Sequence, residues 1–335
     1  MTALLSSGGA RLRLRLSNEL GGSAVPVDTV EVALAGPDGS IIAGSTRTMT
    51  FGGAARAVIS AWSPLESDPV DLATEPGARL AISIHAPGET ATLAMHPLAG
   101  AETRMTQGGS ADLSTMPGGG RIVAGRILLT AIDVDGPAAR TIVTIGDSIT
   151  DGRENERWPD VLSSRLAGRA GVANVGISGN RLLSMGTGQP ALARLDRDVL
   201  GVPGARYLIL FQGINDIGGS VRDRLPMPAP ATIMAAYRQI ISRAHARGIR
   251  VIGATLLPYR DAFFYSPEGD AVRRAVNGWI RSAGAFDGVI DFEKALADPR
   301  SPDRLSPEFD SGDHIHPNAA GFRRMGAMID LSLFR

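Results

Sequence analysis

The chain has 335 residues, of which 44% are hydrophobic and 20% charged, and its formal net charge is zero. This is the composition of an ordinary globular protein of about two domains, without the basic field that would attract nucleic acid or an anionic membrane. The absence of cysteine excludes disulfides, thiolate metal sites and a cysteine nucleophile. No stretch reaches the ~20 apolar residues of a membrane span, and residues 1–10 lack the pattern of a signal peptide.

Residues 1–135 are predicted to form an all-β domain. Residues 11–16 alternate arginine with leucine, which is the period of a strand with one buried face. Further short strands are predicted at 29–34, 47–51, 57–59, 79–85, 92–95 and 122–132. Turn-forming pairs such as Pro76-Gly77 separate them, and residues 116–120 form a glycine-rich loop. Many short strands with such turns indicate a sandwich or jelly roll.

Residues 136–335 are predicted to form an α/β domain, because strands there alternate with helices. The expected strands are 141–145, 172–175, 207–211, 251–256 and 289–291. The expected helices are 158–168, 191–200, 232–247, 271–283 and 319–333. This alternation predicts a parallel sheet of five strands with helices on both faces. We expect the sheet to be flavodoxin-like, with the strand order 2-1-3-4-5.

Three loops that follow predicted strands carry residues suited to acyl chemistry. Ser148 comes just after the first strand, where open α/β sheets place their ligands, although it also suits a turn that caps the next helix. Gly179 follows the second strand, and a glycine lets a backbone N–H approach a substrate oxygen. Asn215 follows the third strand, where its side-chain amide is able to donate to an oxyanion. Glycine and Asn-Asp are also common in simple turns.

A loop near the C-terminus carries the base that a serine nucleophile needs. Histidine accepts a proton at neutral pH, and a carboxylate fixes its tautomer. Asp313 and His316 are three residues apart, close enough to touch within a turn. His314 is the competing base, and we favour His316 because Pro317 would pin its backbone. A metal site formed by Asp313, His314 and His316 is the alternative interpretation.

These segments together resemble a known family. The resemblance is to the four sequence blocks of the SGNH (GDSL-type) hydrolases, and it is carried by Gly146-Asp147-Ser148-Ile149, Gly179, Gly213-Ile214-Asn215-Asp216 and Asp313-His314-Ile315-His316-Pro317. It covers about residues 141–335, and Ile149 stands where the family usually has leucine. The resemblance implies Ser148 as nucleophile, His316 with Asp313 as base, and Ser148, Gly179 and Asn215 as oxyanion donors.

The resemblance also implies a function. It suggests a serine esterase that cleaves short acyl esters, with O-acetyl groups on carbohydrate as the favoured substrate and no cofactor or metal. The N-terminal domain resembles the extra sandwich of some extracellular esterases that act on acylated sugars, which favours a secreted or periplasmic location. Trp62 and Phe51 are its only aromatic residues, so a packing platform is the alternative role. An acyltransferase and a non-catalytic carbohydrate-binding protein are the alternative functions.

Overall fold

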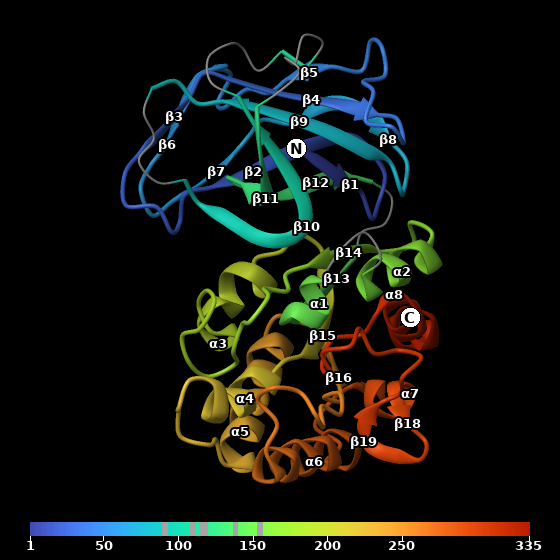
Figure 1. Cartoon of the computed structure of the whole chain (residues 1–335). Coiled ribbons are helices and arrows are strands. Elements are labelled where there is room, and N and C mark those ends of the chain that lie inside the picture. Colours follow the sequence, from blue (N-terminus) through green and yellow to red (C-terminus); the bar gives the residue numbers. More distant parts are fainter. Residues whose placement is uncertain (89–92, 107–111, 114–119, 137–139, 153–156) are drawn as a thin grey trace. The chain divides into compact units, whose positions relative to one another are not determined.

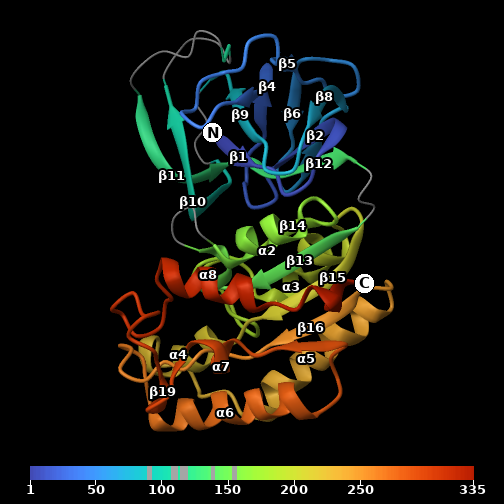
Figure 2. The same cartoon turned by 90° about the vertical axis from the view of Figure 1, so that its right-hand side faces the viewer.

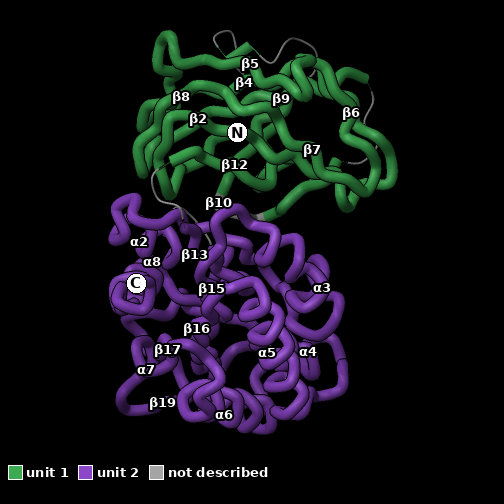
Figure 3. The backbone as a smooth tube through the Cα atoms, turned by 180° about the vertical axis from the view of Figure 1, so that it is seen from behind, with its two compact units in different colours: residues 1–139 green, residues 140–335 purple. Residues whose placement is uncertain are grey.

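The structure, a computed structural model, describes residues 1–88, 93–106, 112–113, 120–136, 140–152 and 157–335. Most of the predicted glycine-rich loop at 116–120 lies outside these residues. The chain divides into two compact units, Met1–Ala139 and Arg140–Arg335, which Figure 3 shows in different colours.

Unit 1 consists of antiparallel strands (Figure 1). Its strands are β1 (Thr2–Leu4), β2 (Gly9–Ser17), β3 (Val25–Val27), β4 (Thr29–Ala35), β5 (Arg47–Thr48), β6 (Ala57–Ile59), β7 (Pro64–Glu66), β8 (Val70–Thr74), β9 (Arg79–His85), β10 (Met95–Met105), β11 (Arg121–Ile127) and β12 (Leu129–Asp135). One sheet has the order β1-β9-β4-β5, and a second has the order β12-β2-β7 with β8 also paired to β2. Two smaller pairs, β10-β11 and β3-β6, complete the unit.

The core of unit 1 lies between its two larger sheets. In β2, Leu12, Leu14 and Leu16 are buried whereas Arg11 and Arg13 are exposed, so the predicted alternation is confirmed. These leucines share one apolar cluster with residues of β4 and β9, which belong to the other sheet. Burying one face of each sheet against the other is how a sandwich forms its core, so the predicted all-β sandwich is confirmed.

The prediction of one strand over residues 122–132 was wrong. Leu128 has a φ of 61°, which ends β11 and starts β12 in another direction. As a result β11 pairs with β10, whereas β12 pairs with β2. No glycine or proline marks this break, because residues 127–129 are all isoleucine or leucine. Strands β1, β3, β7 and β8 were not predicted, and β5 is shorter than the expected 47–51.

Unit 2 is built from one parallel sheet and the helices around it. Its strands are β13 (Thr141–Gly146), β14 (Gly171–Asn174), β15 (Ala205–Phe211), β16 (Arg250–Ala254) and β17 (Gly288–Ile290), with a small hairpin of β18 (Ala297–Asp298) and β19 (Ser301–Leu305). Its α-helices are α1 (Ser148–Asp151), α2 (Trp158–Leu166), α3 (Ala191–Leu195), α4 (Ile214–Arg222), α5 (Pro230–His245), α6 (Pro267–Ser282), α7 (Phe292–Leu296) and α8 (Ala319–Met328). A π-helical turn (Asp196–Leu200) continues α3, and a 3₁₀ turn (Leu331–Phe334) follows α8.

The parallel sheet has the order β14-β13-β15-β16-β17, so the predicted order 2-1-3-4-5 is confirmed. Figure 2 shows β14, β13, β15 and β16 side by side in that order. Helices α2, α7 and α8 lie on one side of the sheet and α3, α4 and α5 on the other (Figures 1 and 3). This is the SGNH hydrolase fold. Its strands β13, β14 and β15 are neighbours, so the loops after their carboxyl ends meet at one edge.

Two expectations for unit 2 were wrong in detail. Asn215 was expected in a loop after the third strand, but helix α4 begins at Ile214, so Asn215 lies in its first turn. The last helix was expected to continue to residue 333, but α8 ends at Met328. Asp330 then caps the following 3₁₀ turn by accepting a hydrogen bond from the backbone N–H of Ser332 at 2.9 Å.

None of the helices in the described ranges has both the length and the apolar character needed to cross a membrane.

Candidate active site

Ser148 lies where β13 gives way to helix α1. A Cβ on Gly146 would lie 2.1 Å from the Thr150 hydroxyl oxygen, so only glycine allows the chain to turn this tightly. Asp147 caps the helix by accepting from the backbone N–H of Ile149 at 3.0 Å. Burial raises the pKa of Asp147 to about 7, and the nearby carboxylates of Asp216 and Asp151 add to this effect. Ser148 is the first helical residue and is half-buried.

Three predicted residues form a continuous chain of hydrogen bonds. The Oγ atom of Ser148 lies 2.7 Å from Nε2 of His316, and Nδ1 of His316 lies 2.6 Å from Oδ2 of Asp313. A carboxylate beside Nδ1 favours the tautomer that carries its proton there, so Nε2 is the atom that accepts from the serine hydroxyl. The His316 side chain is 15% exposed, so it is shielded from most of the solvent.

The loop that carries His316 is closed at its base. Asn318 caps α8 through its amide oxygen and donates its amide to the carbonyl oxygens of Glu308 and Asp310, at 2.9 and 3.1 Å. Ser311 N–H donates to the carbonyl oxygen of His316 at 3.0 Å. Burial alone would raise the pKa of Asp313, but hydrogen bonds from the backbone and ring of His316 hold it at about 2. Asp313 is therefore ionised at neutral pH and orients His316.

His314, the competing base, has a different partner. Its Nδ1 atom lies 2.7 Å from Oδ2 of Asp310, and its backbone N–H donates to Oδ1 of the same residue at 3.0 Å. Its φ is 65°, so the chain turns sharply here and sends the two histidine rings to different carboxylates. The described residues contain no group of three or more His, Asp or Glu side chains placed to hold a metal ion.

The predicted oxyanion donors are unpaired within the described part of the chain. The backbone N–H of Gly179 and the side-chain Nδ2 of Asn215 make no hydrogen bond to any described residue. Gly179 has a φ of 75°, and a Cβ there would meet the Thr187 hydroxyl at 2.8 Å, so the position requires glycine. Ser148 opens α1, where its N–H has no carbonyl partner inside the helix.

Buried polar side chains tie the three loops together. Asp151 of α1 accepts from the backbone N–H and the hydroxyl of Ser178, at 3.0 and 2.8 Å. Asp216 of α4 accepts from the N–H groups of Leu182 and Leu183, at 2.7 and 2.9 Å. The loop after β14 is therefore bonded to the segments after both β13 and β15, which brings the segments of Ser148, Gly179 and Asn215 together.

Two residues that contact the candidate side chains were not identified from the sequence. Asp310 holds His314, and Arg222 donates to the amide oxygen of Asn215 at 3.0 Å. The only signal for Arg222 is its position seven residues after Asn215, which places it on the same helix face. That signal becomes visible only once α4 is known to be a helix.

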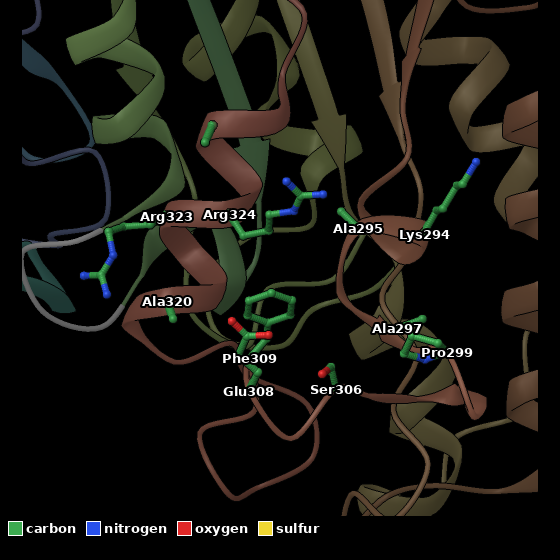
Figure 4. A pocket seen from close by; sticks show the side chains of 11 residues that line it. Lys294, Ala295, Ala297, Pro299, Ser306, Glu308, Phe309, Ala320, Arg323 and Arg324 are labelled. Atoms are coloured by element: carbon green, nitrogen blue, oxygen red, sulfur yellow. The ribbon is translucent and has the colours of Figure 1, made fainter.

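A separate surface depression lies beside α7 and α8 (Figure 4). Lys294, Phe309, Arg323 and Arg324 are among the side chains that line it. None of the predicted site residues lines it, so we assign it no part in the chemistry.

The strand order of the sheet and the loops that it brings together are those of the SGNH hydrolase fold. Residues 144–324, more than half of the chain, match the GDSL-like lipase/acylhydrolase family. The chain belongs to this family.

Several solved structures are similar to this chain over a little more than half of its length. A putative lipolytic protein of the G-D-S-L family from Desulfitobacterium hafniense is 24% identical, with 56% of this chain and 95% of that one covered and a TM-score of 0.43. A putative acylhydrolase from Bacteroides fragilis is 20% identical, with 58% and 86% covered and a TM-score of 0.46. An acetylxylan esterase from Geobacillus stearothermophilus is 21% identical, with 56% and 91% covered and a TM-score of 0.43. No curated protein matches the chain.

Proposed function

We propose that this protein is a serine esterase that hydrolyses short-chain acyl esters through an acyl-enzyme on Ser148. The observation that carries the proposal is the hydrogen-bond chain from Ser148 Oγ through His316 to Asp313, at 2.7 and 2.6 Å. A serine hydroxyl is a weak nucleophile unless a base accepts its proton, and we assign that role to Nε2 of His316.

The first half-reaction forms the acyl-enzyme. Ser148 Oγ attacks the ester carbonyl carbon while its proton passes to Nε2 of His316. The carbonyl oxygen becomes negative, and the N–H groups of Ser148 and Gly179 and the Nδ2 of Asn215 stabilise it. When this intermediate collapses, the bond to the alcohol oxygen breaks and His316 returns the proton to the departing alcohol.

The second half-reaction releases the acid. A water molecule attacks the acyl-enzyme carbonyl while His316 takes one of its protons. The bond to Ser148 Oγ then breaks, the serine recovers a proton from His316, and the carboxylic acid leaves. Asp313, ionised at neutral pH because its pKa is about 2, stabilises the imidazolium in both halves. We further propose O-acetylated carbohydrate as the natural substrate, because the N-terminal domain resembles the extra sandwich of some esterases that act on acylated sugars.

One panel of substrates tests this function. The protein is assayed with p-nitrophenyl esters of increasing acyl length and with acetylated xylan, beside Ser148→Ala as the matched control. We expect turnover of the shortest esters, release of acetate from xylan, and no turnover by the variant. Transfer of the acyl group to an added alcohol in preference to water would indicate an acyltransferase. Absence of both turnover and covalent labelling by a serine-directed phosphonate would indicate a non-catalytic binding protein.

A further inference from the structure

The side-chain amide of Asn215 is held in one orientation by a cation. Nη1 of Arg222 lies 3.0 Å from Oδ1 of Asn215. A guanidinium group carries donors only, so the group that faces it is the amide oxygen and not the amide nitrogen. The NH₂ group of Asn215 is therefore turned away from Arg222, and it makes no hydrogen bond to any other residue that the structure describes.

Helix geometry explains how Arg222 reaches this amide. The two residues lie in α4 and are seven positions apart, which is close to two turns of helix and places them on the same face. Side chains of a helix lean toward its N-terminus, so the long arginine at the last position extends back toward the first turn. A short side chain such as alanine or serine at position 222 would not span this distance.

Arg222 is itself fixed by two further contacts. Its Nε atom donates to Oδ2 of Asp223 at 3.0 Å, and its guanidinium carbon lies 5.8 Å from the centre of the Phe264 ring. Asp223 is also paired with Arg181, whose side chain is almost fully buried in the loop after β14. Phe264, 4% exposed, comes from the segment after β16. Side chains from the segments after β14, β15 and β16 therefore hold the Arg222 guanidinium against the Asn215 amide.

We propose that Arg222 is a positioning residue that orients and polarises the Asn215 amide toward the reaction's oxyanion. This inference rests on the proposed function. Without Arg222 the amide is free to turn over and present its oxygen to a developing negative charge, which is repulsive. A positive group on the amide oxygen also strengthens the N–H groups as donors, because linked hydrogen bonds polarise one another. Both effects act on the charged intermediate and not on the neutral ester, so Arg222 should affect kcat more than KM.

A double-mutant cycle tests this inference. The variants are Arg222→Met, Arg222→Lys, Asn215→Ala and the pair Arg222→Met with Asn215→Ala, all assayed on one soluble ester. Methionine keeps much of the packing, and Arg181 still neutralises Asp223 in this variant. Arg224→Met is the matched control, since Arg224 lies two residues away, is exposed and makes no hydrogen bond to Asn215. Circular dichroism and thermal melting verify that each variant folds.

We expect Arg222→Met to lower kcat on the order of tenfold, which is less than the about 10²–10³ lost when an oxyanion donor is removed. KM should change only a few-fold, Arg222→Lys should recover part of kcat, and Arg224→Met should match the wild type. In the Asn215→Ala background, Arg222→Met should have almost no further effect, because the group through which it acts is gone. An equal loss of kcat in both backgrounds would overturn the inference and leave the proposed function standing. A normal kcat for Asn215→Ala alone would remove the oxyanion role on which the inference depends.

Discussion

Nε2 of His316 lies 2.7 Å from Oγ of Ser148, although 168 residues separate the two along the chain. Ser148 follows the second strand of the sheet in spatial order, and His316 lies in the last loop before the C-terminal helix α8. The last loop therefore returns across the sheet to the segment after β13. Its closed base at Asn318 and the Asp313 hydrogen bonds hold His316 at this distance.

Replacing Ser148 with alanine should abolish ester turnover. Loss of the nucleophile in a serine protease lowers kcat on the order of 10⁶-fold, and a similar loss is expected here. The fold should persist, because one half-buried hydroxyl at a helix start is removed. Steady-state assays and circular dichroism measure the two effects. A serine-directed phosphonate should add once per wild-type chain, at Ser148, and near-normal activity of the variant would end the hypothesis.

The two histidines of the last loop should differ in their effect on activity. His316→Ala should be nearly inactive, whereas His314→Asn should keep most activity, because the His314 ring pairs with Asp310 and not with Ser148. Asparagine tolerates the positive φ at this position and so provides a matched control. The rate should fall in acid as His316 becomes protonated, since imidazolium cannot accept the serine proton. The reverse order of the two variants would show that His314 is the base, and strong inhibition by a chelator would favour a metal site.

Removing the amide of Asn215 should lower kcat and leave KM almost unchanged. The ester carbonyl is neutral in the ground state, whereas the tetrahedral intermediate carries a full negative charge on oxygen. Asn215→Ala should therefore lower kcat by about 10²–10³-fold, or roughly 2.7–4 kcal/mol. Asn215→Asp should be at least as damaging, because Arg222 would hold one carboxylate oxygen while the other faces the oxyanion. A raised KM with normal kcat would instead identify Asn215 as a substrate clamp.

The sheet of unit 2 was predictable because its central strands are short, buried apolar runs bounded by glycine and polar residues. Residues 207–211 are one such run, and β15 occupies them. Helix α4 was not predictable, since its first turn contains Asn215-Asp216 and its middle contains Gly218 and Gly219, a composition typical of turns. Phe264 packs against Gly218, where a Cβ would lie 2.5 Å from the ring. A tertiary contact therefore selects glycine in this helix.

From the sequence, the site residues could be assigned to the segments after the strands and to the last loop, and Asp313 could be paired with His316 by their spacing. The contact between Ser148 and His316 could not be derived in this way. Short motifs marked Ser148, Asn215 and His316, because each lies beside glycine, proline or aspartate at a strand or helix end. Which histidine faces the serine depends on the φ of 65° at His314, and no neighbouring residue signals that value. The Arg222 contact likewise depends on a helix that local propensity does not favour.

The buried carboxyl of Asp147 should make the stability of the protein depend on pH. Burial raises the pKa of Asp147 to about 7 in the native state, whereas the same group has a pKa of about 3.8 when it is unperturbed. Between these pH values the native state therefore holds a proton that the unfolded chain has released. The contribution of Asp147 to the free energy of unfolding therefore falls as the pH rises through that window, and it falls no further above about pH 7.

Asp147→Asn should remove this pH-dependent decrease in the free energy of unfolding. Asparagine is neutral at every pH, and its amide oxygen is still able to cap α1 by accepting from Ile149. Because one pKa unit corresponds to about 1.4 kcal/mol, the variant should be more stable than the wild type by on the order of 4 kcal/mol at pH 8. The difference should shrink toward zero as the pH falls below about 3.8, where Asp147 becomes protonated in the unfolded chain as well.

Urea unfolding of both proteins at pH 4, 6 and 8 measures the effect. Asp196→Asn is the matched control, since the Asp196 side chain is 71% exposed and forms a surface ion pair with Arg243. Removing a surface pair should change stability by less than about 1 kcal/mol. If the difference in the free energy of unfolding between wild type and Asp147→Asn is the same at pH 4 and pH 8, then ionisation of Asp147 does not destabilise the native state. The buried cluster of Asp147, Asp151 and Asp216 would then carry its negative charge with compensation from Arg194, whose guanidinium lies 3.4 Å from the carbonyl oxygen of Gly146.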